Sequence, residues 1–213
     1  MVRVKICGIT NWTDARLAVD AGADALGFNF YRESPRYIAP DEARTIATRL
    51  PRRVVLVGVF VNASAEEVLR VARNVDLNAL QLHGEESPAE VARLSESYPV
   101  IKALRVGPGF KAGRLARYGS ASAFLLDGFD RKRRGGTGNT FDWSVAKAAK
   151  KYGAIIVAGG LNPENVARAI RESQPFGVDV CGGVEASPGK KDPERLRALM
   201  EEIALVRNGV ATG

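Results

Sequence analysis

The chain alternates short aliphatic segments with amphipathic segments eight times, and this alternation constrains the fold more than any other feature. Such a pattern is typical of a parallel sheet covered by helices, because parallel strands need long crossover connections. The expected strands lie near residues 2–7, 24–29, 53–60, 78–82, 99–104, 122–127, 154–158 and 177–181. The expected helices lie near residues 13–21, 40–50, 64–73, 87–97, 110–118, 142–151, 163–172 and 192–207.

Eight strand–helix units are the number that closes a (β/α)8 barrel, or TIM barrel. We therefore predict an α/β fold with a single (β/α)8-barrel catalytic domain over residues 1–213, although such barrels typically have ~250 residues. An open doubly wound sheet is the alternative. Its glycine fingerprint would follow the first strand, where Gly8 stands alone. The glycine-rich stretch 135–138 fits a mobile loop after the sixth strand better than a domain boundary.

Composition excludes several classes of protein. No apolar run reaches the ~18 residues of a membrane span, and the N-terminus lacks the pattern of a signal peptide. The chain has 2 cysteines, too few for a disulfide framework, so we expect a reducing cytoplasm. Because His83 is the 1 histidine, a histidine-rich metal site is excluded and we expect no metal.

The formal net charge of +7 indicates either nucleic-acid binding or attraction of small anions. The basic residues are mostly scattered, and the one dense run covers residues 131–134. That run fits a solvated loop, a loop that borders an anion site, or a nucleic-acid contact. The run lacks the interleaved aromatic residues that are typical of RNA-binding surfaces.

Two expected strands end in a reactive side chain followed by glycine, at Cys7-Gly8 and at Asp127-Gly128. Enzymes with parallel sheets place their chemistry at the carboxyl ends of strands. A thiol and a carboxyl group that face one pocket could move two protons on one substrate, one as base and one as acid. Lys5 would share the strand face of Cys7 and favour its thiolate. The alternatives are an inert core cysteine and a paired structural aspartate.

Two further features follow expected strands. Arg36, after the second strand, could clamp a carboxylate through two hydrogen bonds, or it could be an ordinary surface arginine. His83, after the fourth strand, is expected to be structural rather than a ligand.

Glycine pairs follow the seventh and eighth strands, at Gly159-Gly160 and at Gly182-Gly183. Glycine lets backbone N–H groups approach an anion closely, and (β/α)8 barrels commonly bind phosphate with the loops after these two strands. The matched positions favour a phosphate site over plain turns.

These segments together resemble the phosphoribosylanthranilate isomerase family of tryptophan biosynthesis, and the resemblance spans the chain. It rests on Lys5-Ile6-Cys7-Gly8-Ile9-Thr10, Ser34-Pro35-Arg36, Gly58-Val59-Phe60, Gln81-Leu82-His83-Gly84, Leu126-Asp127, Gly135-Gly136-Thr137-Gly138, Ala158-Gly159-Gly160-Leu161 and Gly183-Val184-Glu185. The resemblance implies a (β/α)8 barrel without cofactor or metal. It also implies an Amadori rearrangement of N-(5′-phosphoribosyl)anthranilate to 1-(o-carboxyphenylamino)-1-deoxyribulose 5-phosphate.

The resemblance further implies a role for each matching residue. Asp127 resembles the general acid that protonates the ring oxygen, and Cys7 resembles the general base that removes the C2 proton. The implied substrate contacts are Arg36 for the anthranilate portion and Gly159, Gly160, Gly182 and Gly183 for the phosphate. The implied partner is a small anionic phosphoribosyl substrate rather than nucleic acid or a membrane, and the implied assembly is a monomer or homodimer.

The chain departs from the family pattern after the eighth strand. The family usually reads Asp-Val-Ser-Ser-Gly-Val-Glu there, whereas Cys181 and Gly182 replace the two serines. Backbone N–H donors for phosphate survive, but two hydroxyl groups are lost. Cys7 and Cys181 end neighbouring strands of a closed barrel, so the spacing permits a disulfide under oxidising conditions. We nevertheless expect the two thiols to point apart.

Two rival functions remain open. A histidine-pathway sugar isomerase performs the same rearrangement with two aspartates, and Cys7 in the first position argues against it. A non-catalytic nucleic-acid-binding protein would use the basic run 131–134, and salt-sensitive binding to generic DNA without isomerase activity would favour it.

Overall fold

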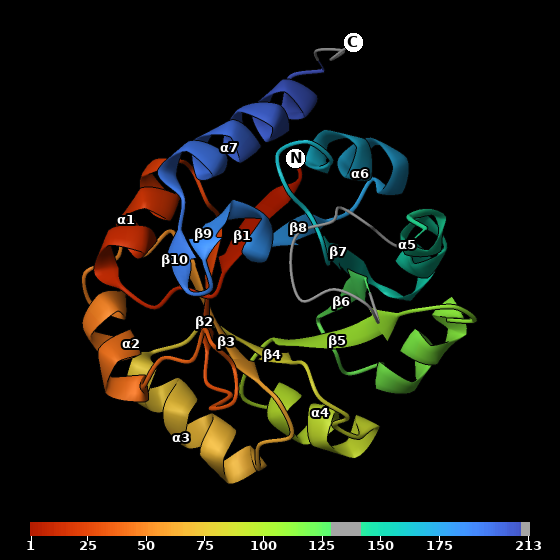
Figure 1. Ribbon diagram of the computed structural model, residues 1–213. Coiled ribbons are helices and arrows are strands. Elements are labelled where there is room, and N and C mark those ends of the chain that lie inside the picture. Colours follow the sequence, from red (N-terminus) through yellow and green to blue (C-terminus); the bar gives the residue numbers. More distant parts are fainter. Residues whose placement is uncertain (129–141, 210–213) are drawn as a thin grey trace.

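Eight parallel strands close into a barrel in chain order, from β1 next to β2 round to β8 next to β1 (Figure 1). The computed structural model describes residues 1–128 and 142–209. The strands are β1 Arg3–Cys7, β2 Ala25–Asn29, β3 Val55–Phe60, β4 Ala79–Leu82, β5 Val100–Val106, β6 Ala123–Gly128, β7 Ala154–Ala158 and β8 Gly177–Val180. The predicted (β/α)8 barrel is confirmed and the doubly wound alternative is wrong.

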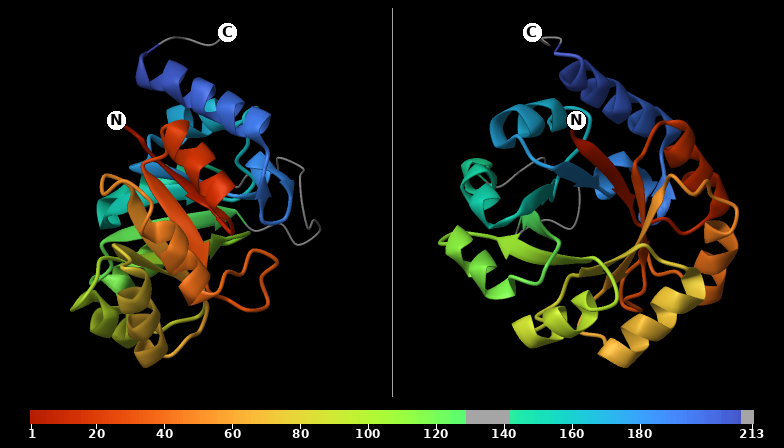
Figure 2. Two further views of the ribbon diagram at one scale, coloured as in Figure 1. Left: turned by 90° about the vertical axis from the view of Figure 1, so that its left-hand side faces the viewer. Right: turned by 180° about the vertical axis from the view of Figure 1, so that it is seen from behind.

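Helices surround the strands on the outside of the barrel (Figure 2). The α-helices are α1 Trp12–Asp20, α2 Pro40–Ala47, α3 Ala65–Val75, α4 Pro88–Ser95, α5 Ser144–Ala149, α6 Val166–Ser173 and α7 Pro193–Arg207. Short 3₁₀ helices are η1 Ala112–Tyr118, η2 Lys150–Tyr152 and η3 Gly182–Val184. None of the described helices is both long and apolar enough to cross a membrane.

Four expected helices differ from those observed by three or more residues or in type, and one of them, expected over 40–50, ends at Ala47. The segment expected as an α-helix over 110–118 is the 3₁₀ helix η1, which contains Gly113, a poor α-helix former. The helix expected from 163 begins only at Val166. Asn162 and Asn165 cause this delay, because each side-chain oxygen accepts from the backbone N–H of the other. The helix expected over 142–151 is shorter, and its last turn is the 3₁₀ helix η2.

The core has two layers, inside and outside the strands. Strand residues alternate between the barrel interior and the helices, so Leu125 of β6 points inward while Phe124 and Leu126 contact the helical layer. Half of the inner layer is alanine; its residues are Val57, Ala79, Ile101, Ala103, Ala123, Leu125, Ile156 and Ala158. Small inner residues leave room for the buried polar side chains of Lys5, Gln81 and Asp179.

A small hairpin that the sequence did not predict follows β8. Its strands β9 (Glu185–Ser187) and β10 (Lys190–Lys191) pair antiparallel. The hairpin lies beside β1 in Figure 1, and at the same end of the barrel as the loop between β2 and α2 in the left view of Figure 2. Strands this short have no readable alternation, so only the packing on the barrel defines them. The basic run 131–134 and the glycine stretch 135–138 lie outside the described residues.

Candidate active site

Cys7 is the last residue of β1, and its side chain points into the barrel beside that of Lys5. Gly27 of β2 is the register partner of Cys7. A Cβ atom at Gly27 would lie 2.8 Å from the Cys7 sulfur and 3.0 Å from Lys5 Nζ. Glycine at this position therefore makes room for both side chains, and the prediction that they share one strand face is confirmed.

The surroundings of Cys7 favour its thiolate. Hydrogen bonding by Cys181 lowers the pKa of Cys7 most; burial opposes this, and the charges of Lys5 and Lys191 add to the lowering. Lys5 is itself paired with Asp179 at 2.9 Å, and both side chains are buried. Although burial works against the ammonium, the charges of Asp179 and Cys7 raise the pKa of Lys5, so its positive charge is retained.

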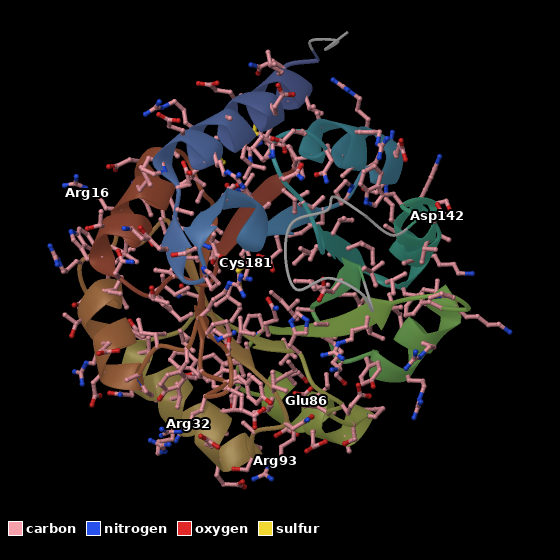
Figure 3. The ribbon with its side chains drawn as sticks, in the orientation of Figure 1. Arg16, Arg32, Glu86, Arg93, Asp142 and Cys181 are labelled. Carbon is pink, nitrogen blue, oxygen red and sulfur yellow. The ribbon has the colours of Figure 1, made fainter. Side chains whose placement is uncertain are left out.

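Cys181 lies beside Cys7, so the expectation that the two thiols point apart is wrong. The ladder between β1 and β8 ends at the pair Ile6 and Val180, which sets the next residues, Cys7 and Cys181, side by side. The interaction with Cys7, together with burial, raises the pKa of Cys181 well above its usual range, so Cys181 is the protonated member of the pair, and its Sγ also donates to Glu185 Oε1 at 3.8 Å. Both cysteines are free, and Cys181 lies near the centre of the barrel mouth (Figure 3).

Gly8 joins this thiol pair to Arg36. The backbone at Gly8 has φ +74°, which disfavours side chains, and a Cβ there would lie 2.9 Å from the Cys181 sulfur and 2.7 Å from Arg36 Cδ. A larger residue would therefore displace either neighbour. This requirement explains why glycine follows the candidate base.

Asp127 of β6 contacts His83, which follows β4. His83 Nε2 lies 3.2 Å from Asp127 Oδ2, and His83 Nδ1 lies 2.9 Å from the side-chain nitrogen of the buried Gln81. If the Gln81 amide donates to Nδ1, the ring proton sits on Nε2 and is donated to Asp127. His83, which we expected to be structural, therefore touches the candidate acid. Its position at a strand end, like that of Asp127, was the sequence signal.

Gly159 packs against the other side of Asp127. The backbone at Gly159 has φ +83°, and a Cβ there would lie 2.7 Å from Asp127 Oδ1 and 2.3 Å from the backbone nitrogen of Gly128. Because Oδ2 faces His83, Oδ1 is the carboxyl oxygen nearer the glycine loop. The Asp127 side chain is 30% exposed, so it remains accessible at the barrel mouth.

The Cys7 and Asp127 halves of the site face the same barrel interior. Asp179, beside Lys5 and Cys7, also interacts electrostatically with His83. Burial raises the pKa of Asp179 to about 6, with Lys5 opposing and the Cys7 charge reinforcing the rise. The barrel thus places a thiolate-favouring group and a hydrogen-bonded carboxyl group at the same end of its strands, the two groups that the sequence analysis singled out.

Arg36 is not an ordinary surface arginine. Its Nε donates to Glu185 Oε1 at 2.9 Å and its Nη2 donates to Glu185 Oε2 at 2.6 Å. These bonds raise the pKa of Arg36 further. One edge of the guanidinium is thus committed to Glu185, whose role the residue pattern alone did not indicate. A ligand carboxylate would meet the remaining donors rather than the full fork.

The two glycine pairs lie in loops that touch. A Cβ at Gly183 would lie 1.9 Å from the backbone oxygen of Leu161, the residue after Gly159-Gly160. Both Gly159 and Gly160 have positive φ, at +83° and +67°. The two pairs are therefore neighbours, as a shared phosphate site would require, while phosphate binding itself stays a prediction. Among the described residues, no group of three or more histidine, cysteine or carboxylate side chains is arranged to hold a metal ion.

Comparison with known proteins gives one consistent result. The family model described as N-(5′phosphoribosyl)anthranilate (PRA) isomerase matches residues 4–202. A relative from Citrifermentans bemidjiense named N-(5′-phosphoribosyl)anthranilate isomerase is 51% identical over 209 residues, covering 97% of this chain and 100% of its own length.

Solved structures agree with the sequence comparison. The crystal structure of phosphoribosyl anthranilate isomerase from Thermotoga maritima superposes with a TM-score of 0.90 at 47% identity, covering 96% of this chain and 99% of its own. A structure described as this isomerase in complex with reduced 1-(o-carboxyphenylamino)-1-deoxyribulose 5-phosphate has a TM-score of 0.86 at 45% identity, covering 96% and 99%.

Proposed function

The chain belongs to the N-(5′-phosphoribosyl)anthranilate isomerase family, and we propose that Asp127 and Cys7 carry out its Amadori rearrangement as general acid and general base. The protein is an aldose–ketose isomerase of tryptophan biosynthesis. The observation that carries the residue assignment is the thiolate-favouring environment of Cys7 at the barrel mouth that also presents Asp127.

Asp127 opens the sugar ring in the first step. Its carboxyl group protonates the furanose oxygen, the C1–O bond breaks, and the anthranilate nitrogen forms a Schiff base with C1. His83 supports this role because its hydrogen bond to Oδ2 orients the carboxyl group and leaves Oδ1 toward the site. His83 acts through Asp127 and is therefore a positioning residue.

Cys7 removes the C2 proton in the second step. The electron pair of the C2–H bond then forms a C1–C2 double bond and neutralises the Schiff-base nitrogen, and the resulting enol tautomerises to the ketose. A base at this position must be deprotonated before it meets the substrate. The Cys181 donor and the Lys5 and Lys191 charges provide that condition.

Substrate binding uses the two anionic ends of the molecule. We infer that Arg36 meets the anthranilate carboxylate with the donors that Glu185 leaves, and that the loops of Gly159, Gly160, Gly182 and Gly183 hold the phosphate. The relative solved in complex with reduced 1-(o-carboxyphenylamino)-1-deoxyribulose 5-phosphate supports a phosphoribosyl substrate. No cofactor enters this scheme.

The assembly and location are part of the same proposal. We infer one catalytic domain over residues 1–213, a monomer or homodimer, in the cytoplasm. A Thermotoga maritima relative is described as monomers generated from a dimeric isomerase, which supports either state. Light scattering coupled to size-exclusion chromatography measures the mass of the assembly directly.

One experiment tests the proposed function. Phosphoribosylanthranilate is added to the pure protein, and the loss of its anthranilate fluorescence is followed. Iodoacetamide labelling of Cys7, mapped by peptide mass spectrometry, should abolish turnover, and bound product should protect the thiol. Full activity after stoichiometric labelling at Cys7 rules out Cys7 as the base, and absence of turnover in the unlabelled protein rules out the reaction.

A further inference from the structure

Lys191, in the unpredicted hairpin, has the most buried charge near the candidate site. Its side chain is 0% exposed, and its backbone N–H donates to Asp14 Oδ2 of α1 at 2.8 Å. Lys191 is also the register partner of Glu185 across the hairpin. Burying an ammonium is costly unless all its hydrogen bonds are made, so its bonding partners indicate its structural role.

The Lys191 ammonium has three donors and meets three acceptors. It donates to the backbone oxygen of Cys7 at 2.6 Å, to that of Cys181 at 3.3 Å, and to Glu185 Oε1 at 3.1 Å. Cys7 and Cys181 lie just past the last ladder pair of β1 and β8, so Lys191 joins the strand ends where the regular pairing stops. No donor remains for substrate, because lysine has three N–H bonds at most.

Glu185 bonds both Lys191 and Arg36 and so links the two side chains. The Glu185 side chain is 4% exposed, and besides Lys191 it accepts from Arg36 and from the backbone N–H of Gly189. The direction of the Arg36 guanidinium is therefore set by a carboxylate that Lys191 holds. One buried ammonium thus touches the backbone of the base directly and the substrate clamp through one intermediate.

We propose that Lys191 is a positioning residue for both ends of the site: it fixes the backbone of Cys7 and Cys181 and, through Glu185, aims Arg36. The inference rests on the proposed function, because it uses the roles of Cys7 and Arg36 given there. A buried pair that served stability alone would need only Glu185. The bonds to the two carbonyl groups place the charge beside the thiol pair instead.

The test compares two variants. Lys191→Met keeps a side chain of similar length and removes the buried positive charge, and Lys190→Met removes a positive charge from the exposed neighbouring residue. Lys191→Met should lower kcat about tenfold or more and raise KM. It should also shift the midpoint of the pH dependence of Cys7 alkylation upward by about one pH unit. Lys190→Met should change none of these.

Neither variant replaces the other charged and titratable groups that act on Cys7. They are Lys5 of β1, Asp179 of β8, Cys181 after β8, and Arg36 of the loop between β2 and α2. A shift found in Lys191→Met and not in Lys190→Met therefore reports on the loss of the Lys191 ammonium and of the positions it holds. A lower thermal unfolding midpoint with unchanged kcat, KM and alkylation midpoint would mean that Lys191 serves stability only, which overturns the proposal.

If Lys191→Met does not fold, Glu185→Gln tests the proposal through the link to Arg36. It keeps the size of the side chain and one oxygen for Arg36, and it removes the charge that pairs with Lys191. KM should rise several-fold, and an unchanged KM overturns the proposal. Failure of the proposed function is a separate outcome, since wild-type protein would then either show no turnover or stay active after Cys7 labelling, whatever the Lys191 variant does.

Discussion

At the scale of single residues, the site depends on pairs that lie far apart in sequence. Cys7 meets Cys181 and Asp127 meets His83, so each candidate catalytic group has a neighbour that sets its protonation or its orientation. Cys181, at the position where the family pattern described above has a serine, still offers a hydrogen-bond donor. Its thiol lies beside the candidate base and also reaches Glu185 Oε1 at 3.8 Å.

Asp127→Asn tests the acid. The amide cannot deliver the proton that opens the ring, so kcat should fall by a factor of about 100 to 10,000 with little change in the thermal unfolding midpoint. Steady-state fluorescence kinetics measure this loss. Asp142→Asn is the control, because Asp142 is an exposed aspartate at the outside of the barrel (Figure 3). A loss of less than about tenfold in Asp127→Asn would show that Asp127 is not the acid.

Contact between the two thiols predicts reversible inactivation by oxidation. Diamide removes two electrons and two protons from the Cys7 and Cys181 thiols as the disulfide forms, and is itself reduced to the hydrazine. Activity should disappear because the base is consumed, and dithiothreitol should restore it. Non-reducing peptide mapping identifies the bond, and Cys181→Ser should resist diamide. Two free thiols and full activity after treatment would contradict the prediction.

At the scale of elements, the loops after β7 and β8 are interlocked by glycine. Gly183→Ala would drive a Cβ into the Leu161 carbonyl group, whereas a Cβ at Gly182 would meet its nearest atom, Arg36 Nη2, at an ordinary 3.4 Å. We expect Gly183→Ala to lower the free energy of unfolding by about 1–3 kcal/mol through overpacking. Gly182→Ala should cost clearly less. Denaturant unfolding compares the two variants, and equal losses would argue against the interlock.

At the scale of the whole molecule, Asp24 ties the two ends of the chain together. Its carboxylate accepts from Arg3 and from the backbone N–H of Val4 near the N-terminus, and from Arg207 at the end of α7. Arg207 also donates to the backbone oxygen of Val2. Besides the pairing of β1 with β8, these bonds join the start of β1 and the residue before β2 to the end of α7.

Asp24→Asn therefore predicts a pH-dependent loss of stability. Burial raises the pKa of Asp24, but the bonds from Val4, Arg3 and Arg207 outweigh it and lower the pKa below 3.8. The folded protein then binds fewer protons than the unfolded chain just below pH 3.8, so the stabilisation is complete above that pH and is lost as the pH falls. The wild type should exceed the variant by about 1 kcal/mol at pH 7, allowing for solvent screening, and by less at pH 3.

Urea unfolding of both proteins at the two pH values measures that difference. Asp20→Asn is the matched control, because Asp20 is 70% exposed and its pair with Arg16 spans 3.8 Å on the helix surface. A gap between wild type and Asp24→Asn that is the same at pH 3 and pH 7 would contradict the assignment to the carboxylate.

Much of this protein was readable from the sequence alone. The eightfold alternation predicted the barrel, because strand and helix periods are local properties of the chain. The strand ends identified Cys7 and Asp127, since an aliphatic run shows where a parallel strand stops. The glycine pairs and Arg36 followed from the same logic. Residues assigned by family resemblance stay proposals, although the family itself is confirmed.

Only the tertiary structure decided which of those residues meet and what holds them. Lys5 bonds Asp179 across a sequence separation of 174, and Lys191 reaches Cys7 across 184, because closing the barrel brings β8 and its hairpin against β1. Local periodicity does not predict such contacts, and it did not predict the 3₁₀ form of residues 112–118. The sequence determined which groups stand at the barrel mouth. Closure of the barrel determined their charge, direction and partners.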